Sequence, residues 1–194
     1  MQEDKEDMGN DIKILTFTGA SGSGKTTIVK ELLSRNPSWK NLPSLTSREQ
    51  RSSDLENEHT YGIPRNELEE KERNGELLWL VEAHGNLFGT SKEDVDVALK
   101  APYVSLSILK PECIASLKKY AGEGVLSFYI LSPKEDVLRK RLEERREHSK
   151  EEIEERIAEC KKWDEEAKNS GIPYTFITND GTVDELVEQV MRLL

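Results

Sequence analysis

The sequence predicts a three-layer α/β fold in which a parallel sheet of about five strands is covered by helices on both faces. Apolar, β-branched segments alternate with segments of helical periodicity along the 194 residues, and this alternation is typical of parallel strands joined by right-handed crossovers. Residues 19–26, GASGSGKT, join the first such strand to the first helix. Ligands of these sheets bind beyond the carboxyl ends of the strands, so this segment marks the expected site.

Residues 19–26 match the phosphate-binding pattern G-x-x-x-x-G-K-[ST] at every required position. The glycines allow a tight turn whose backbone N–H groups point at phosphate oxygens. We expect Lys25 to reach the β- and γ-phosphates and Thr26 to offer its hydroxyl to Mg²⁺. The segment therefore predicts a site for ATP or GTP. The expected contacts come from Gly19, Ser21, Gly22, Ser23, Gly24, Lys25, Thr26 and Thr27.

The flanks of this loop agree with the pattern, because an apolar strand is expected over 12–18 and an amphipathic helix follows, with Ile28 and Leu32 on its buried face. Residues 44–51, SLTSREQR, begin as a short extended stretch. Arg48 and Arg51 follow hydroxyl side chains there, an arrangement that suits a phosphate, although two arginines alone equally fit a solvated loop. A short helix near 65–74, a strand over 77–83 and a turn at 85–86 follow and suggest an inserted unit.

The second half of the chain returns to alternating helices and strands. Helices are expected over 91–99 and 111–120, and strands over 102–109, 124–131 and 173–177. Capping patterns predict further helices that begin at Ser132, Ser149 and Thr182. We expect the last two helices to bury the apolar residues of one face each. Those residues are Ile153, Ile157, Cys160 and Trp163, then Leu186, Val187, Val190 and Leu194.

Composition excludes several classes of protein. A formal net charge of −10 and a pI near 5.0 argue against a general affinity for nucleic acid or anionic membranes, which lysine and arginine clusters hold. Cys113 and Cys160 belong to no disulfide or zinc pattern. No apolar segment approaches the ~20 residues that span a bilayer, and the acidic start MQEDKEDMGN is unlike a signal peptide. We expect a cytoplasmic protein with a disordered tail at 1–10, and leave its oligomeric state open.

From about residue 14 onward, the motifs resemble the guanylate kinase family of P-loop nucleoside-monophosphate kinases. Residues 44–51 match the acceptor-phosphate motif S-x-T-T-R-x-x-R with Ser47 in place of its second threonine. Residues 84–90, HGNLFGT, resemble H-G-N-Y-Y-G-T, with Phe88 where the family has a phosphate-binding tyrosine. Asn179 and Asp180 resemble the N-D pair that contacts the adenine of ATP.

The resemblance implies a three-layer P-loop kinase that uses ATP and Mg²⁺ and phosphorylates a nucleoside monophosphate, GMP or dGMP by default. It implies a core over 11–40 and 91–194, an acceptor-binding subdomain over about 41–90 and a lid over about 143–150. Arg141, Arg145 and Arg156 reproduce the family's lid spacing, and with Lys25 they are the implied catalytic cations. The implied acceptor-binding residues are Ser44, Arg48, Arg51, Tyr61, Trp79, Glu82 and Thr90.

Departures from the family pattern concentrate where the acceptor is recognised. Trp79 stands where the family has its guanine-reading glutamate, and an indole cannot accept a hydrogen bond. Ser105 and Ser107 replace an acidic pair, while Glu82 is a possible substitute carboxylate. Two alternatives stay open: a kinase of another phosphorylated small molecule such as ribose 1,5-bisphosphate, and a non-catalytic guanylate-kinase-like interaction module. The intact phosphate loop favours catalysis over the module.

Overall fold

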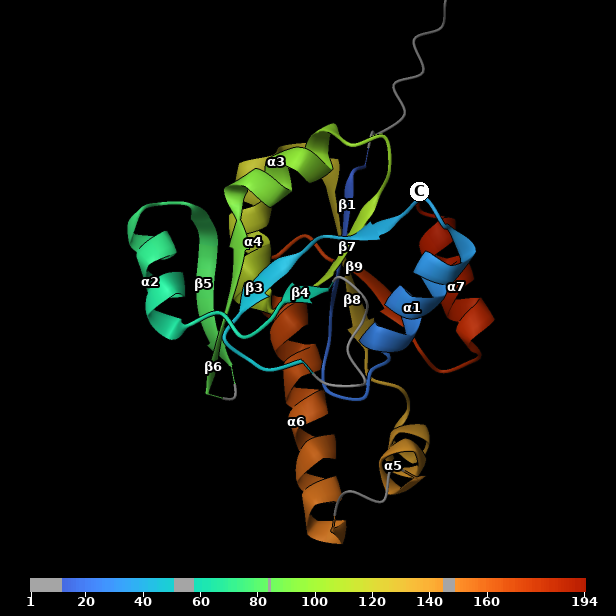
Figure 1. Ribbon diagram of the computed structural model, residues 1–194. Coiled ribbons are helices and arrows are strands. Elements are labelled where there is room, and N and C mark those ends of the chain that lie inside the picture. Colours follow the sequence, from blue (N-terminus) through green and yellow to red (C-terminus); the bar gives the residue numbers. More distant parts are fainter. Residues whose placement is uncertain (1–11, 51–57, 84, 145–148) are drawn as a thin grey trace, which may run out of the picture.

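The computed structural model describes residues 12–50, 58–83, 85–144 and 149–194 (Figure 1). Five strands form a wholly parallel sheet in the order β2-β7-β1-β8-β9, which confirms the predicted α/β fold. These strands are β1 (Ile14–Thr18), β2 (Lys40–Asn41), β7 (Ser105–Ile108), β8 (Val125–Leu131) and β9 (Thr175–Thr178). The predicted tail at 1–10 and the centre of the predicted lid, 145–148, lie outside the described residues.

Helices cover both faces of this sheet. The central strand β1 is therefore buried on both sides. Phe17 on one face stacks on Phe128 with the ring centroids 5.4 Å apart, and α1 (Lys25–Arg35) and α7 (Val183–Met191) pack over this face. Ile14 on the other face packs with Val95 and Leu117, from α3 (Lys92–Lys100) and α4 (Pro111–Ala121). Two apolar clusters therefore hold the three layers together.

A second, four-stranded sheet has the order β4-β3-β6-β5. Its strands are β3 (Ser44–Thr46), β4 (His59–Thr60), β5 (Leu77–Ala83) and β6 (Asn86–Ser91). Helix α2 (Arg65–Arg73) packs on it through the buried Leu68. The sheet occupies the range that the sequence assigns to an inserted subdomain, except that Asn41 pairs with β7 of the first sheet. Strand β6 was not predicted, because Asn86 and Gly89 lower its strand propensity.

Helices α5 (Glu135–Glu144) and α6 (Lys150–Asn169) pack against each other and project beyond both sheets (Figure 1). Leu138, Ile153 and Ile157 form a small core that also includes Ala20 of the loop after β1. The predicted capping boxes at Ser149 and Thr182 are present with both reciprocal hydrogen bonds. The helix pair is thus anchored directly beside the phosphate-binding segment.

Three helix predictions are wrong in detail. Helix α5 begins at Glu135 rather than at Ser132, and tertiary contacts anchor the residues before it: the Ser132 N–H donates to Asp164 Oδ2 at 3.0 Å and the Lys134 N–H to Asp180 Oδ1 at 2.9 Å. Trp163 is 41% exposed although it lies on α6 between the buried Cys160 and Ala167, and Leu194 is 47% exposed because α7 ends at Met191. Within the described ranges, no helix has the length and apolar character that crossing a membrane requires.

Candidate active site

The loop between β1 and α1 has the backbone conformation that its glycines predict. Gly22 and Gly24 have φ values of +83° and +105°, in the region that glycine adopts without steric cost. A Cβ atom added to Gly24 would lie 2.2 Å from Asn179 Nδ2, and one added to Gly19 would lie 2.5 Å from the Ile130 carbonyl oxygen. These contacts are too close for a side chain, so the loop depends on glycine at both positions.

Polar groups gather within the same loop. The Lys25 ammonium donates to the carbonyl oxygens of Gly19 and Ala20, at 2.8 Å each. Ser23 is fully buried, and its Oγ has no hydrogen-bond partner among the residues that the structure describes. The side chains of Ser21, Thr26 and Thr27 are exposed. A glycine cradle with a cation and an unsatisfied buried hydroxyl fits a polyphosphate ligand.

The same residues fit a nucleotide-bound Mg²⁺. Mg²⁺ prefers oxygen ligands and keeps several waters, so it is commonly held by few protein groups together with phosphate oxygens. Thr26 offers an exposed hydroxyl at the start of α1. No group of three or more His, Cys, Asp or Glu side chains able to hold a metal occurs in the described part of the chain. Phosphate oxygens and water would therefore supply most of the coordination.

Asn179 and Arg141 meet beside this loop. Asn179 is 7% exposed, and its Nδ2 donates to the Ser23 carbonyl oxygen at 2.7 Å. The Arg141 guanidinium donates to the backbone oxygen of Asn179 at 3.2 Å. A cavity of about 400 Å³ lies between Arg141, Asn179 and the glycines of the loop. Asn179 thus supports the backbone of the phosphate loop, a contact that the sequence analysis did not anticipate.

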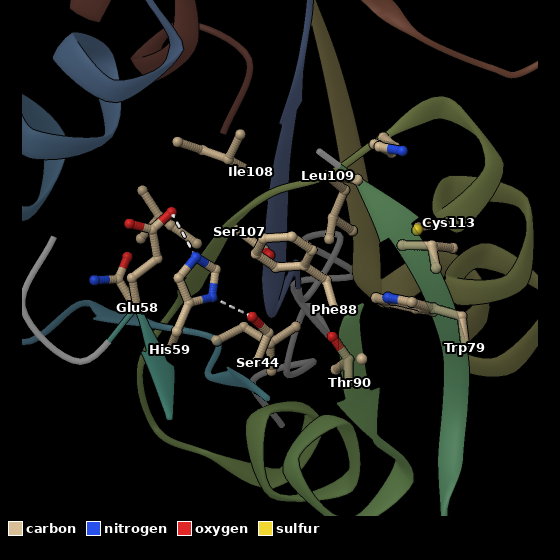
Figure 2. Close-up of a pocket in the computed structure, with 17 residues that line it drawn as sticks. Ser44, Glu58, His59, Trp79, Phe88, Thr90, Ser107, Ile108, Leu109 and Cys113 are labelled. Atoms are coloured by element: carbon tan, nitrogen blue, oxygen red, sulfur yellow. Dashed lines mark hydrogen bonds and ion pairs between the residues drawn. The ribbon is translucent and has the colours of Figure 1, made fainter. Parts of the chain in front are cut away.

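A second cavity, of about 220 Å³, lies between the four-stranded sheet and the carboxyl end of β7 (Figure 2). Trp79, Val81 and Ala83 share one face of β5 and line it, while Glu82 points the other way. Ser44 and Thr90 from the candidate acceptor residues also line it, with Phe88, Ser107, Lys110 and Cys113. Burial raises the pKa of the Cys113 thiol to about 12, so this side chain is a neutral part of the wall.

Glu82 is not available to this cavity as a substitute carboxylate. Its side chain is exposed, and its Oε2 lies 3.2 Å from the Arg65 guanidinium. The carboxylate that does line the cavity is Glu58, directly before β4. The sequence analysis gave Glu58 no role, because a strand of two residues carries no periodicity that could indicate where its neighbours point.

His59 connects Glu58 to the rest of the cavity wall (Figure 2). Its Nδ1 is hydrogen-bonded to Ser44 Oγ, and its Nε2 lies 3.6 Å from Glu58 Oε1. The imidazole ring also packs edge-on against Phe88, with the centroids 5.7 Å apart. The imidazole therefore holds both a hydroxyl and a carboxylate at the cavity.

Tyr61 and the acceptor-phosphate motif, residues 44–51, lie beside this cavity. The ring of Tyr61 packs against His59 with the centroids 5.3 Å apart, and the Arg48 guanidinium lies 5.5 Å from the centre of the Tyr61 ring. Thr46 is buried, and its Oγ1 accepts from the Arg48 backbone N–H at 3.1 Å. Arg51 lies outside the described residues. Within the described part of the motif, Ser44 therefore lines the cavity, whereas Thr46 and Arg48 adjoin it without lining it.

The candidate lid is described only in part. Arg156 is half-buried on α6, and Arg141 lies on α5 against Asn179. Arg145 lies outside the described residues. The roles of these three arginines as catalytic cations therefore stay predictions.

The phosphate loop and the second cavity adjoin at the carboxyl edge of the parallel sheet. Thr18, which leads into the loop, donates through Oγ1 to the Leu109 carbonyl oxygen at 3.0 Å. Leu109 lines the cavity, and its backbone N–H donates to the Phe17 oxygen at 3.1 Å. A phosphate loop at this edge, with a cavity of an inserted sheet beside it, places the chain among P-loop nucleotide-binding proteins.

Within that class, the sequence model of the family described as guanylate kinase matches residues 11–194. The chain belongs to the guanylate kinase family.

Individual members of the family show the extent of the similarity. The chain is 29% identical over 185 residues to the guanylate kinase of Wolbachia sp. subsp. Brugia malayi, covering 95% of this chain and 93% of the relative. It is 32% identical over 167 residues to that of Carboxydothermus hydrogenoformans, covering 86% and 80%. The crystal structure of guanylate kinase from Anaplasma phagocytophilum superposes with a TM-score of 0.65 at 19% identity, covering 95% and 85%, and shares the fold.

Proposed function

We propose that the protein transfers the γ-phosphoryl group of ATP to a nucleoside monophosphate, GMP or dGMP by default, and releases the diphosphate and ADP. The observation that carries this proposal is the adjacency of the phosphate loop and the acceptor cavity, which the hydrogen bond from Thr18 to Leu109 ties together at 3.0 Å. Phosphoryl transfer depends mainly on holding donor and acceptor in line. The named relatives, all guanylate kinases, support the same assignment.

The proposal assigns a task to each group of side chains. Lys25, Arg141, Arg145 and Arg156 neutralise charge on the transferring phosphoryl group, and a bound Mg²⁺ supplies further neutralisation on the phosphate oxygens. Ser44, Arg48, Arg51 and Tyr61 bind the phosphate of the acceptor, while Trp79 and Thr90 contact its base. Transfer of this kind needs no covalent intermediate on the protein. We place the enzyme in the cytoplasm, as its sequence predicts.

The lining of the cavity favours a nucleotide over the two alternatives. Trp79, Val81 and Phe88 offer an apolar and aromatic wall, which suits a flat base more than the hydroxyl groups of a phosphorylated sugar. The glycine geometry of the phosphate loop is intact, which favours a catalyst over a non-catalytic interaction module.

The direct test is release of ADP from ATP and Mg²⁺ in the presence of GMP, dGMP, AMP, dTMP, UMP or ribose 1,5-bisphosphate. We expect turnover with at least one of the nucleoside monophosphates and only the background rate without an acceptor. Turnover with ribose 1,5-bisphosphate alone would show that the acceptor is a phosphorylated sugar and not a nucleotide. Absence of acceptor-dependent ADP release with every compound would contradict the proposal.

Replacing Trp79 by glutamate is expected to shift the preference toward GMP, about 10-fold or more relative to AMP, dTMP and UMP. A carboxylate at this position accepts hydrogen bonds from guanine, whereas the indole offers stacking area and one N–H donor. The ratio of kcat/KM values for the four acceptors measures the shift. A wild-type enzyme that already rejects the other three by about 10⁴-fold would contradict the role given to Trp79.

Replacing Arg156 by alanine is expected to lower kcat about 10-fold or more with little change in the affinity for ATP, because a lid cation acts chiefly on the transition state. Steady-state kinetics and ATP titration separate the two effects. Lys162→Ala provides the control, since Lys162 lies on the same helix with a 73% exposed side chain. A higher KM for ATP at unchanged kcat would make Arg156 a binding residue instead.

A further inference from the structure

We propose that Glu58 is the specificity-determining carboxylate of the acceptor cavity and that it accepts a hydrogen bond from an exocyclic amino group of the acceptor base. The inference rests on the proposed function. It assigns base recognition to the residue directly before β4, across the cavity from the β5 position that Trp79 occupies.

The position of Glu58 relative to the aromatic side chains supports this role. Figure 2 shows Glu58 and Trp79 at opposite sides of the cavity, with the ring of Phe88 between them. A flat base that stacks on either aromatic ring presents its polar edge to a side wall of the cavity. Glu58 places a carboxylate at one such wall. An amino group on the base is the complementary donor, because an ionised carboxylate only accepts hydrogen bonds.

Unlike an exposed surface carboxylate, Glu58 is partly buried beside a neighbour of fixed orientation. Its side chain is 21% exposed, and Oε1 lies 3.6 Å from His59 Nε2. The imidazole is oriented from its other side by the hydrogen bond between Nδ1 and Ser44 Oγ. The two oxygens of a carboxylate offer about four acceptor positions, so partners on the protein leave room for a donor on the ligand. The pair with His59 therefore preorganises Glu58 for a donor on the ligand.

Glu82 is the other carboxylate that could be considered for this role. It lies on β5 next to cavity-lining residues, but its side chain is exposed on the outer face of the strand and pairs with Arg65. Lys110, a cation of the same cavity, donates to the backbone oxygen of Glu82 at 3.0 Å. The side-chain carboxylate facing the ligand is thus that of Glu58.

The test compares acceptors that differ by one amino group. The pairs are GMP with IMP, AMP with purine riboside 5′-monophosphate, and CMP with pyrimidin-2-one riboside 5′-monophosphate. For the pair that contains the best substrate, we expect the wild type to prefer the amino-bearing member about 10-fold or more in kcat/KM, as for a charge-assisted hydrogen bond. Glu58→Gln, which keeps the size of the side chain, and Glu58→Ala are expected to reduce this preference at least several-fold.

Glu69→Gln is the matched control, because Glu69 is exposed on α2, which packs on the same sheet. It should keep the wild-type preference. Near-UV circular dichroism checks that the variants are folded, and Glu58→Asp should restore part of the preference. Wild-type discrimination between the paired acceptors in both Glu58→Gln and Glu58→Ala would overturn the inference while leaving the proposed function standing. If no nucleoside monophosphate is phosphorylated, both the proposed function and the inference fail.

Discussion

Replacing Lys25 by alanine is expected to lower kcat by about 10²-fold or more while the protein remains folded. The ammonium neutralises charge that develops on the transferring phosphates, and removal of one such preorganised group has effects of this size. In the structure, Lys25 Nζ donates to two carbonyl oxygens of its own loop. Loss of these two bonds costs about 1 kcal/mol each in folding free energy, which the domain tolerates.

Measurement of kcat together with thermal unfolding separates the catalytic effect of Lys25→Ala from a stability effect. Lys30→Ala is the matched control, because Lys30 lies on the same helix with an exposed side chain. It should leave kcat and the unfolding temperature near their wild-type values. Wild-type turnover by Lys25→Ala would refute the assignment of this loop as the phosphate-binding site.

Replacing Gly24 by alanine is expected to weaken ATP binding by about 10²-fold or more, because the loop would have to rearrange. The added Cβ would lie 2.2 Å from Asn179 Nδ2, the atom that donates to the Ser23 carbonyl oxygen at 2.7 Å. A non-glycine residue at a φ of +105° adds strain of about 1–3 kcal/mol. Both effects displace the backbone N–H groups that would contact phosphate.

Isothermal titration with ATP and Mg²⁺ measures this effect, and Gly122→Ala is its control. Gly122 also has a positive φ, +61°, but a Cβ there would meet no atom within 4 Å. Gly122→Ala should therefore lose about 1–3 kcal/mol of stability through backbone strain and bind ATP normally. Equal ATP affinity in Gly24→Ala and the wild type would show that close packing of Asn179 on the loop does not shape the nucleotide site.

Local patterns in the sequence predicted the elements whose causes are local. The capping boxes at Ser149 and Thr182 require only residues three positions apart. The phosphate loop requires glycines at defined spacings, and the strands β1 and β8 are long apolar segments. In contrast, β2 is two residues long and exists because it pairs with β7. The start of α5 was also misplaced, at a segment where the backbone of Ser132 and Lys134 donates to carboxylates distant in the sequence, Asp164 and Asp180.

At the acceptor cavity, some features follow from the sequence and others only from the tertiary structure. The sequence by itself determined that position 79 holds an indole instead of an acceptor carboxylate, but it grouped Glu82 with Trp79 as acceptor-binding residues, whereas the two side chains lie on opposite faces of β5. Only the tertiary structure decided that the face of Trp79 borders the cavity and that Glu58 and His59 close its other side. The physical reason is that these walls come from segments far apart in the chain, and their approach depends on sheet pairing and packing rather than on any local pattern of residues.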